Sequence, residues 1–86
     1  MNFLDLKNAI QTRVGTSYFN LWTIGTTNDC STRKEELETE HKDCRFWEDY
    51  EADNDAVARC VQEYFQRKGM RTDKIDEQES KYIYVF

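Results

Sequence analysis

Two short runs of aromatic and β-branched residues, at positions 17–24 (SYFNLWTI) and 81–86 (KYIYVF), most constrain how this chain can fold. In each run, large apolar side chains occupy both of the alternating faces that a β-strand presents. Such a strand needs cover on two sides, or a place near the centre of a sheet. We therefore predict two strands that belong to the inside of the protein.

The first and third of three predicted helices have clear ends in the sequence. The first helix is expected to begin after Asn2, a common N-cap residue, and to stop at Gly15. The third is expected to begin after Asp53 or Asn54 and to stop at Gly69. Apolar residues recur every three or four positions in both, which predicts one buried stripe on each. The predicted stripes are Phe3, Leu6, Ile10 and Val14 in the first helix and Val57, Cys60, Val61, Tyr64 and Phe65 in the third.

The second predicted helix begins with a T-x-x-E capping box, which Thr32 and Glu35 form. Apolar residues are sparse after it, and the pattern leaves open whether residues 33–52 form one helix or two. Further along, residues 70–75 and 81–86 are predicted to form the two strands of a β-hairpin, connected by the polar sequence DEQES.

These elements follow one another in the order α-β-α-α-β-β, which indicates an α+β fold. We expect a single domain over residues 1–86, with a three-stranded antiparallel sheet and the helices packed on one of its faces. No apolar run approaches the roughly 18–20 residues that span a bilayer. The N-terminal residues also lack the basic and apolar regions of a signal peptide. We therefore expect a cytoplasmic protein without a membrane partner.

The residue types give little support to metal, cofactor or enzymatic chemistry. Cys30, His41, Cys44 and Cys60 are the only soft metal ligands, and no C-x-x-C pair occurs among them. The alternating acids of DYEADND lack the glycine and glutamate that a calcium-binding loop requires. We expect no metal, no cofactor and no catalytic residue, with a thiol- or metal-dependent activity of Cys44 and His41 as the weakest option. A pI near 4.8 argues against direct binding of nucleic acid.

The strongest functional signal is an acidic block at residues 35–55 (EELETEHKDCRFWEDYEADND). It holds ten carboxylates and two basic residues, a net charge of -8 in a chain of -5, so the other residues carry +3. If the block is helical, most neighbours three or four positions apart have like charges, which costs stability. A sequence that keeps these like charges in spite of the lost stability suggests that the electric field itself is used to attract a basic partner. Phe46, Trp47 and Tyr50 lie within the block and can supply aromatic anchors, although the sequence leaves open whether they are core or surface.

These features predict a small acidic binding protein that is not an enzyme, an inhibitor or adaptor. Its acidic, aromatic-studded helical face would dock on a basic protein surface, such as that of a nucleic-acid-handling protein, where carboxylates can mimic phosphates. Small acidic inhibitors encoded by phages or mobile elements have this size and charge. The alternative is a structural module that forms a homodimer through the aromatic face of its sheet. The predicted partner-binding residues are Glu35, Glu36, Glu38, Glu40, Asp43, Trp47, Glu48, Asp49, Tyr50, Glu51, Asp53 and Asp55.

Overall fold

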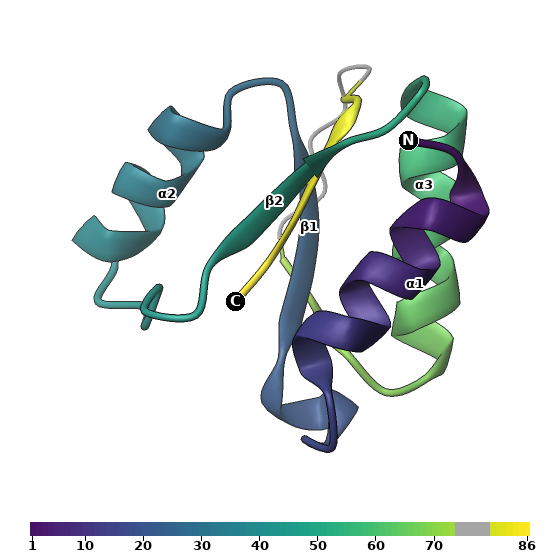
Figure 1. Ribbon diagram of the computed structural model, residues 1–86. Helices are drawn as coiled ribbons and strands as arrows, with labels where there is room; N and C mark the ends of the chain where they lie inside the picture. The colour runs from purple at the N-terminus through teal and green to yellow at the C-terminus, as the bar shows by residue number, and fades with distance from the viewer. Residues whose placement is uncertain (74–79) are drawn as a thin grey trace.

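A computed structural model describes residues 1–73 and 80–86, and within them the chain forms three α-helices, one short 3-10 helix and four strands (Figure 1). In chain order the elements are α1 (Phe3–Val14), η1 (Phe19–Leu21), β1 (Thr23–Thr27), α2 (Cys30–Thr39), β2 (Glu48–Glu51), α3 (Asp55–Arg67), β3 (Arg71–Thr72) and β4 (Tyr82–Val85). Within this part of the chain, no helix is long and apolar enough to cross a membrane.

The four described strands form one mixed sheet in the order β2-β4-β1-β3. Strand β4 pairs antiparallel with both β1 and β2, and β3 pairs parallel with β1. The prediction of a three-stranded antiparallel sheet was therefore wrong. The predicted hairpin was also wrong, because β1 lies between β3 and β4. Of its predicted connection, DEQES, residues 76–79 lie outside the described residues.

Helices cover both faces of this sheet, which corrects the prediction that they pack on one face. One face carries Ile24, Ile83 and Val85, which join the main core with residues of α1 and α3. The opposite face carries Tyr84, which packs against Leu37 of α2. Figure 1 shows the same arrangement, with α2 on one side of the strands and α1 and α3 on the other. The cause lies in β4, whose residues 83–85 are all buried, so that both faces of the strand need apolar cover.

The ends of α1 and α3 agree with the sequence prediction. The side chain of Asn2 accepts a hydrogen bond from the Asp5 amide at 2.8 Å, and that of Asn54 accepts one from the Val57 amide at 2.9 Å. Helix α1 ends at Gly15, which has a φ of 61°. The predicted stripe of α3 was only partly right, because Cys60 is exposed. The residues of α3 that are buried are Ala58, Val61, Gln62 and Phe65.

The predicted strand over residues 17–24 was wrong for its first six residues. Residues 19–21 form the 3-10 helix η1, and β1 starts only at Thr23. Tyr18 and Leu21 are exposed, so the apolar character of this segment is not explained by burial in the sheet.

Helix α2 begins and ends differently from the sequence prediction. Asp29 caps its start by accepting a hydrogen bond from the Thr32 amide at 3.0 Å, so the predicted T-x-x-E box is wrong. At the end of α2, His41 has a left-handed backbone conformation with a φ of 65°. Glycine is the usual residue at such a position. The amide of His41 donates to the Glu38 carbonyl at 3.0 Å, and that of Lys42 donates to the Leu37 carbonyl at 2.9 Å. Residues 33–52 therefore contain the rest of α2, a loop and β2, which is neither one long helix nor two.

Candidate functional site

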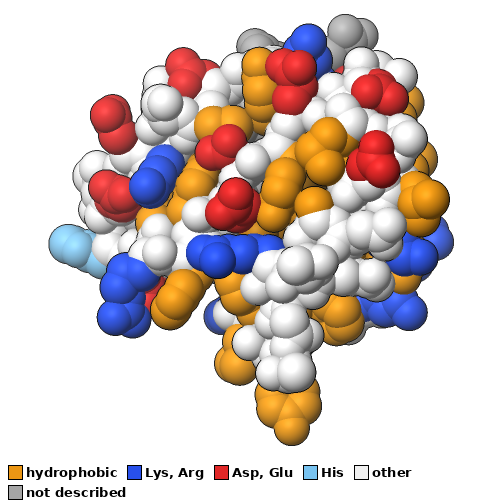
Figure 2. Space-filling view, viewed as in Figure 1, with side chains coloured by type: hydrophobic (Ala, Val, Ile, Leu, Met, Phe, Trp, Pro, Cys, Tyr) orange, Lys and Arg blue, Asp and Glu red, His pale blue; other side chains and the backbone are white. Residues whose placement is uncertain are grey.

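Most of the predicted partner-binding residues fall into two groups, one on α2 and one on β2. The other four lie outside both elements: Asp43 and Trp47 in the loop between α2 and β2, Asp53 after β2, and Asp55 at the start of α3. Figure 2 shows acidic side chains over both elements on the face turned to the viewer, with basic side chains between them. The α2 group lies on an exposed helix surface and includes Glu40, the residue that caps the helix. Its members are Glu35, Glu36, Glu38 and Glu40.

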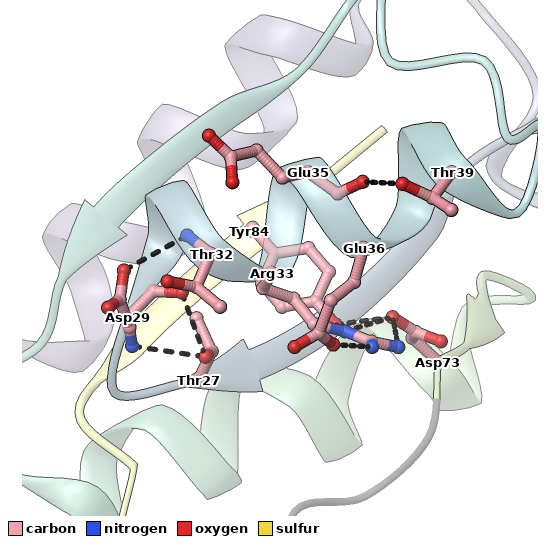
Figure 3. A network of polar contacts seen from close by, with 9 residues as sticks. All are labelled: Thr27, Asp29, Thr32, Arg33, Glu35, Glu36, Thr39, Asp73 and Tyr84. Carbon is pink, nitrogen blue, oxygen red and sulfur yellow. Dashed lines mark hydrogen bonds and ion pairs between the residues drawn. The ribbon is translucent and has the colours of Figure 1, made fainter.

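One stripe of α2 combines three of these acids with two threonines. Thr32, Glu35, Glu36, Thr39 and Glu40 recur at helical spacing and line a shallow depression of about 450 Å³. The hydroxyl of Thr39 donates to the backbone carbonyl of Glu35 at 2.9 Å (Figure 3). Glu36 and its like-charged neighbour Glu40 lie one turn apart at the C-terminal end of α2. At this spacing the two negative charges repel each other, as expected from the sequence.

The β2 group lies on a strand at the edge of the sheet, not on a helix as predicted. Glu48 and Tyr50 face the side of α1 and α3, where the ring of Tyr50 packs partly buried against the main core. Asp49 and Glu51 point to the opposite side, because side chains alternate along a strand. Like-charged pairs within residues 48–55 therefore do not have helical spacing. Acids on an edge strand have a further role, because charge discourages pairing with a foreign strand.

Half of the ten carboxylates in the acidic block have a cation partner within the described residues. Glu36 accepts from the Arg33 guanidinium at 2.8 Å, and Asp43 accepts from that of Arg45 at the same distance. The hydrogen bond from the Arg45 side chain holds the pKa of Asp43 below its ordinary value. Longer contacts of 3.9 Å join Glu48 to Arg13 and Glu51 to Lys81, and Asp53 lies 3.0 Å from the N-terminal amino group.

The other half have no cation within 4.0 Å among the described residues. Asp49 accepts a hydrogen bond from the indole nitrogen of Trp47 at 2.7 Å. Asp55 lies in the first turn of α3, where a negative charge is favourable. The remaining three, Glu35, Glu38 and Glu40, belong to α2 and are exposed.

The predicted aromatic anchors are largely engaged within the protein. Trp47 stacks on Tyr84 with ring centroids 4.7 Å apart and an interplanar angle of 9°. Tyr50 is half-buried, and burial followed by the charge of Glu48 raises the pKa of its phenol. Phe46 is the ring of this block that is most open to solvent, with 57% of its surface exposed.

A partly buried polar network that the sequence did not reveal joins α2 to the sheet (Figure 3). The guanidinium of Arg33 donates to Asp73 at 2.8 Å and to the phenol oxygen of Tyr84 at 3.2 Å. The Tyr84 hydroxyl in turn donates to Asp73. Gly25 lies beside Tyr84 on β1, and a side chain there would collide with the tyrosine ring. A glycine inside a strand pattern is the sequence signal for such a close approach.

We call this network of Arg33, Asp73 and Tyr84 the clamp, because it fastens α2 to the sheet. Burial raises the pKa of Tyr84, and the hydrogen bond to Asp73 raises it further. Burial alone would lower the pKa of Arg33, but hydrogen bonds to Tyr84, Asp73 and Glu36 raise it above its ordinary value. Both shifts favour the neutral form of Tyr84 and the charged form of Arg33.

Burial disfavours the thiolate form of two of the three cysteines, Cys30 and Cys44. Burial, with the nearby charges of Asp49 and Asp29, raises the pKa of Cys30 to about 11. Burial and the charge of Glu38 raise the pKa of Cys44. A high pKa leaves little thiolate for nucleophilic attack. Among residues 1–73 and 80–86, no group of three or more His, Cys, Asp or Glu side chains is arranged to hold a metal ion.

Comparisons with known proteins assign no family to the chain, because no family model, curated protein or solved structure matches it.

Proposed function

We propose that this chain is a small, non-enzymatic binding protein that docks the acidic surface of α2 on a basic surface of a partner protein. The partner surface is one that otherwise holds nucleic acid, so the protein acts as an inhibitor or adaptor in the cytoplasm. The neighbouring acids of β2 extend the negative field and steer the partner toward α2.

The observation that carries this proposal is the contrast between paired and unpaired carboxylates. Acids elsewhere in the block mostly pair with cations of the protein itself, as Asp43 does with Arg45. Glu35, Glu38 and Glu40 have no such partner within 4.0 Å in the described part of the chain. Together they keep like charges close on one exposed helix, at a cost to the helix of a few tenths of a kcal/mol per pair. A cationic partner would remove that repulsion on binding.

Homodimerisation through the sheet, the alternative function, finds less support in the geometry. The aromatic face of KYIYVF is not free, because Tyr84 is fully buried under α2 and Trp47. Self-association along the edge strand β2 would bring Glu48, Asp49 and Glu51 of two copies together, and like charges opposite each other destabilise a strand pair.

The test is affinity capture from a lysate with two immobilised variants of equal net charge. The site variant is Glu35→Lys/Glu38→Lys. The control is a triple variant away from α2, built at positions that are exposed: Asn20→Lys, Glu63→Lys and Gln66→Lys. Each changes the net charge by +4, because a Glu→Lys substitution counts twice. Bound proteins are eluted with salt up to about 0.5 M, where screening limits the interaction between charges to a few ångströms.

We expect the wild type and the control to retain the same basic protein, which salt or competing duplex DNA releases, and the site variant to lose it. Retention of that protein by the site variant would refute the α2 surface as the docking site. Equal loss in both variants would mean that overall charge, and not this surface, attracts the partner.

A further inference from the structure

A groove at one end of the sheet has the composition of a ligand site. It lies where β1 begins and β4 ends, encloses about 640 Å³, and so falls within the range of small-molecule sites. In Figure 2 the lower edge of the molecule is hollowed, with hydrophobic side chains on either side of the hollow. The lining residues used below are Leu21, Trp22, Lys42, Phe46, Arg71 and Phe86.

The walls of this groove are aromatic and partly open to solvent. Trp22 and Phe46 pack against each other at a tilted angle of 55°, with ring centroids 6.4 Å apart. Phe46 is 57% exposed and Leu21 is 63% exposed, whereas Trp22 is almost buried at 9%. Single exposed apolar residues need no explanation, but here several from different segments of the chain line one hollow.

The charges in the groove do not cancel. Two side-chain carboxylates line it, those of Asp43 and Asp73, and each pairs with an arginine that is not part of the lining: Asp43 with Arg45 and Asp73 with Arg33. Lys42 and Arg71 also line the groove, and neither has a carboxylate within 4.0 Å among the described residues. The carbonyl oxygen of Phe86 already accepts the amide of Thr23 at 2.7 Å. An acidic protein therefore has a cationic, aromatic hollow on one side.

We propose that this groove binds a small amphipathic organic anion, one with a ring or apolar chain beside a carboxylate or sulfonate. The apolar part packs against the exposed edges of Trp22 and Phe46, and the anionic group is held by Lys42 and Arg71. Charge-assisted hydrogen bonds to both cations supply orientation, and burial of the ring supplies most of the affinity. The acidic stripe of α2 has no part in this site, so the inference is independent of the docking function.

The test uses 8-anilinonaphthalene-1-sulfonate, a fluorescent aromatic anion, as the probe, and its neutral analogue N-phenyl-1-naphthylamine. We expect one probe molecule per protein, a rise in the thermal midpoint with probe concentration, and weaker binding of the neutral analogue. The stoichiometry and the thermal shift exclude binding to unfolded protein, which would lower the midpoint.

Two double variants locate the probe. Lys42→Gln/Arg71→Gln removes both cations of the groove, and we expect its dissociation constant to rise at least about tenfold, because two charge-assisted contacts are lost. The control Arg59→Gln/Arg67→Gln has the same net charge and changes two exposed residues of α3, so its affinity should stay within about twofold of the wild type. Phe46→Ala tests the apolar wall and should also weaken binding.

Equal affinity of the two double variants would overturn the site. Equal binding of the anionic and neutral probes would overturn the anion preference, and absence of binding to the folded wild type would overturn the proposal as a whole.

Discussion

Replacing Gly25 with alanine should destabilise the protein, although glycine is the weaker strand former. Glycine in a strand interior ordinarily costs about 0.5–1 kcal/mol relative to alanine. Here an added Cβ would lie within 3.0 Å of three atoms of the Tyr84 ring, namely Cε2, Cζ and Oη. No real Cβ makes such contacts, so the ring would have to move.

The ring cannot move without losing the contacts that hold it. Its hydroxyl bonds to Arg33 and Asp73, and its face stacks on Trp47. A hydrogen bond to a charged group contributes about 1.5–3 kcal/mol, and an aromatic pair about 0.5–1.5 kcal/mol. If one such bond and part of the stacking are lost, and the gain from strand propensity is subtracted, the expected net destabilisation is about 1–4 kcal/mol.

Urea denaturation of Gly25→Ala and of the double variant Gly25→Ala/Tyr84→Leu tests this reasoning. The single variant should have a lower midpoint at unchanged m-value. Tyr84→Leu alone is also destabilised, but with the ring removed the alanine should add little further cost or even stabilise the strand. The coupling between the two sites should thus reach about 2 kcal/mol or more. A Gly25→Ala protein as stable as the wild type, or additive effects of the two substitutions, would refute the steric account.

Three further predictions concern other parts of the molecule. His41→Gly should raise stability by up to about 1 kcal/mol, seen as a higher thermal midpoint, because glycine adopts a φ of 65° without strain; an unchanged or lower midpoint would contradict this. The hydrogen bond from the Thr32 amide lowers the pKa of Asp29 below its unfolded value, so the stability that Asp29 contributes is present above about pH 4 and lost as pH falls through the folded pKa. Urea midpoints over this pH range should fall less steeply in Asp29→Asn, which keeps the cap but does not titrate; equal slopes would argue against the assignment. A thiol reagent at about pH 8 should modify Cys60 first, because Cys60 is exposed while burial raises the pKa of Cys30 and Cys44, and Cys60→Ser should remove the fast phase.

Local signals in the sequence were sufficient where an element's ends depend on its own residues. Asn2 and Gly15 mark α1 because capping is a contact between neighbours in the chain, and Asn54 marks α3 for the same reason. The apolar character of both faces of β4 likewise predicted a central strand, which the burial of its residues 83–85 confirms.

Elements that depend on distant partners were missed. The sequence EDYE of β2 has three acids in four residues and becomes a strand only because β4 pairs with it. The end of α2 was missed because His41 stands where glycine is usual. Strand β3 lies within the predicted strand at residues 70–75, but its pairing was wrong, because two residues carry no periodicity that could show a parallel partner.

The candidate site was predictable in its charge but not in its arrangement. The count of carboxylates identified the acidic block, and the exposure of Glu35, Glu38 and Glu40 agrees with that expectation. The division of the block between α2 and β2 and the inward stacking of Trp47 arise from tertiary contacts. The clamp of Arg33, Asp73 and Tyr84 joins three segments far apart in the chain, so no local sequence pattern predicts it.

The strand order has a consequence for how the protein is made. Ile24 and Glu48 both pair with Val85, so the strand that joins β1 to β2 is synthesised after both of them. In the described sheet no strand pairs with its neighbour in sequence, and folding must therefore close long loops before any ladder gains stability. Topologies of this kind fold on the order of milliseconds to seconds. On the ribosome, α1 and β1 must wait for residues 82–85 to emerge, with the acidic edge of β2 exposed and its charge keeping it from pairing with other nascent chains.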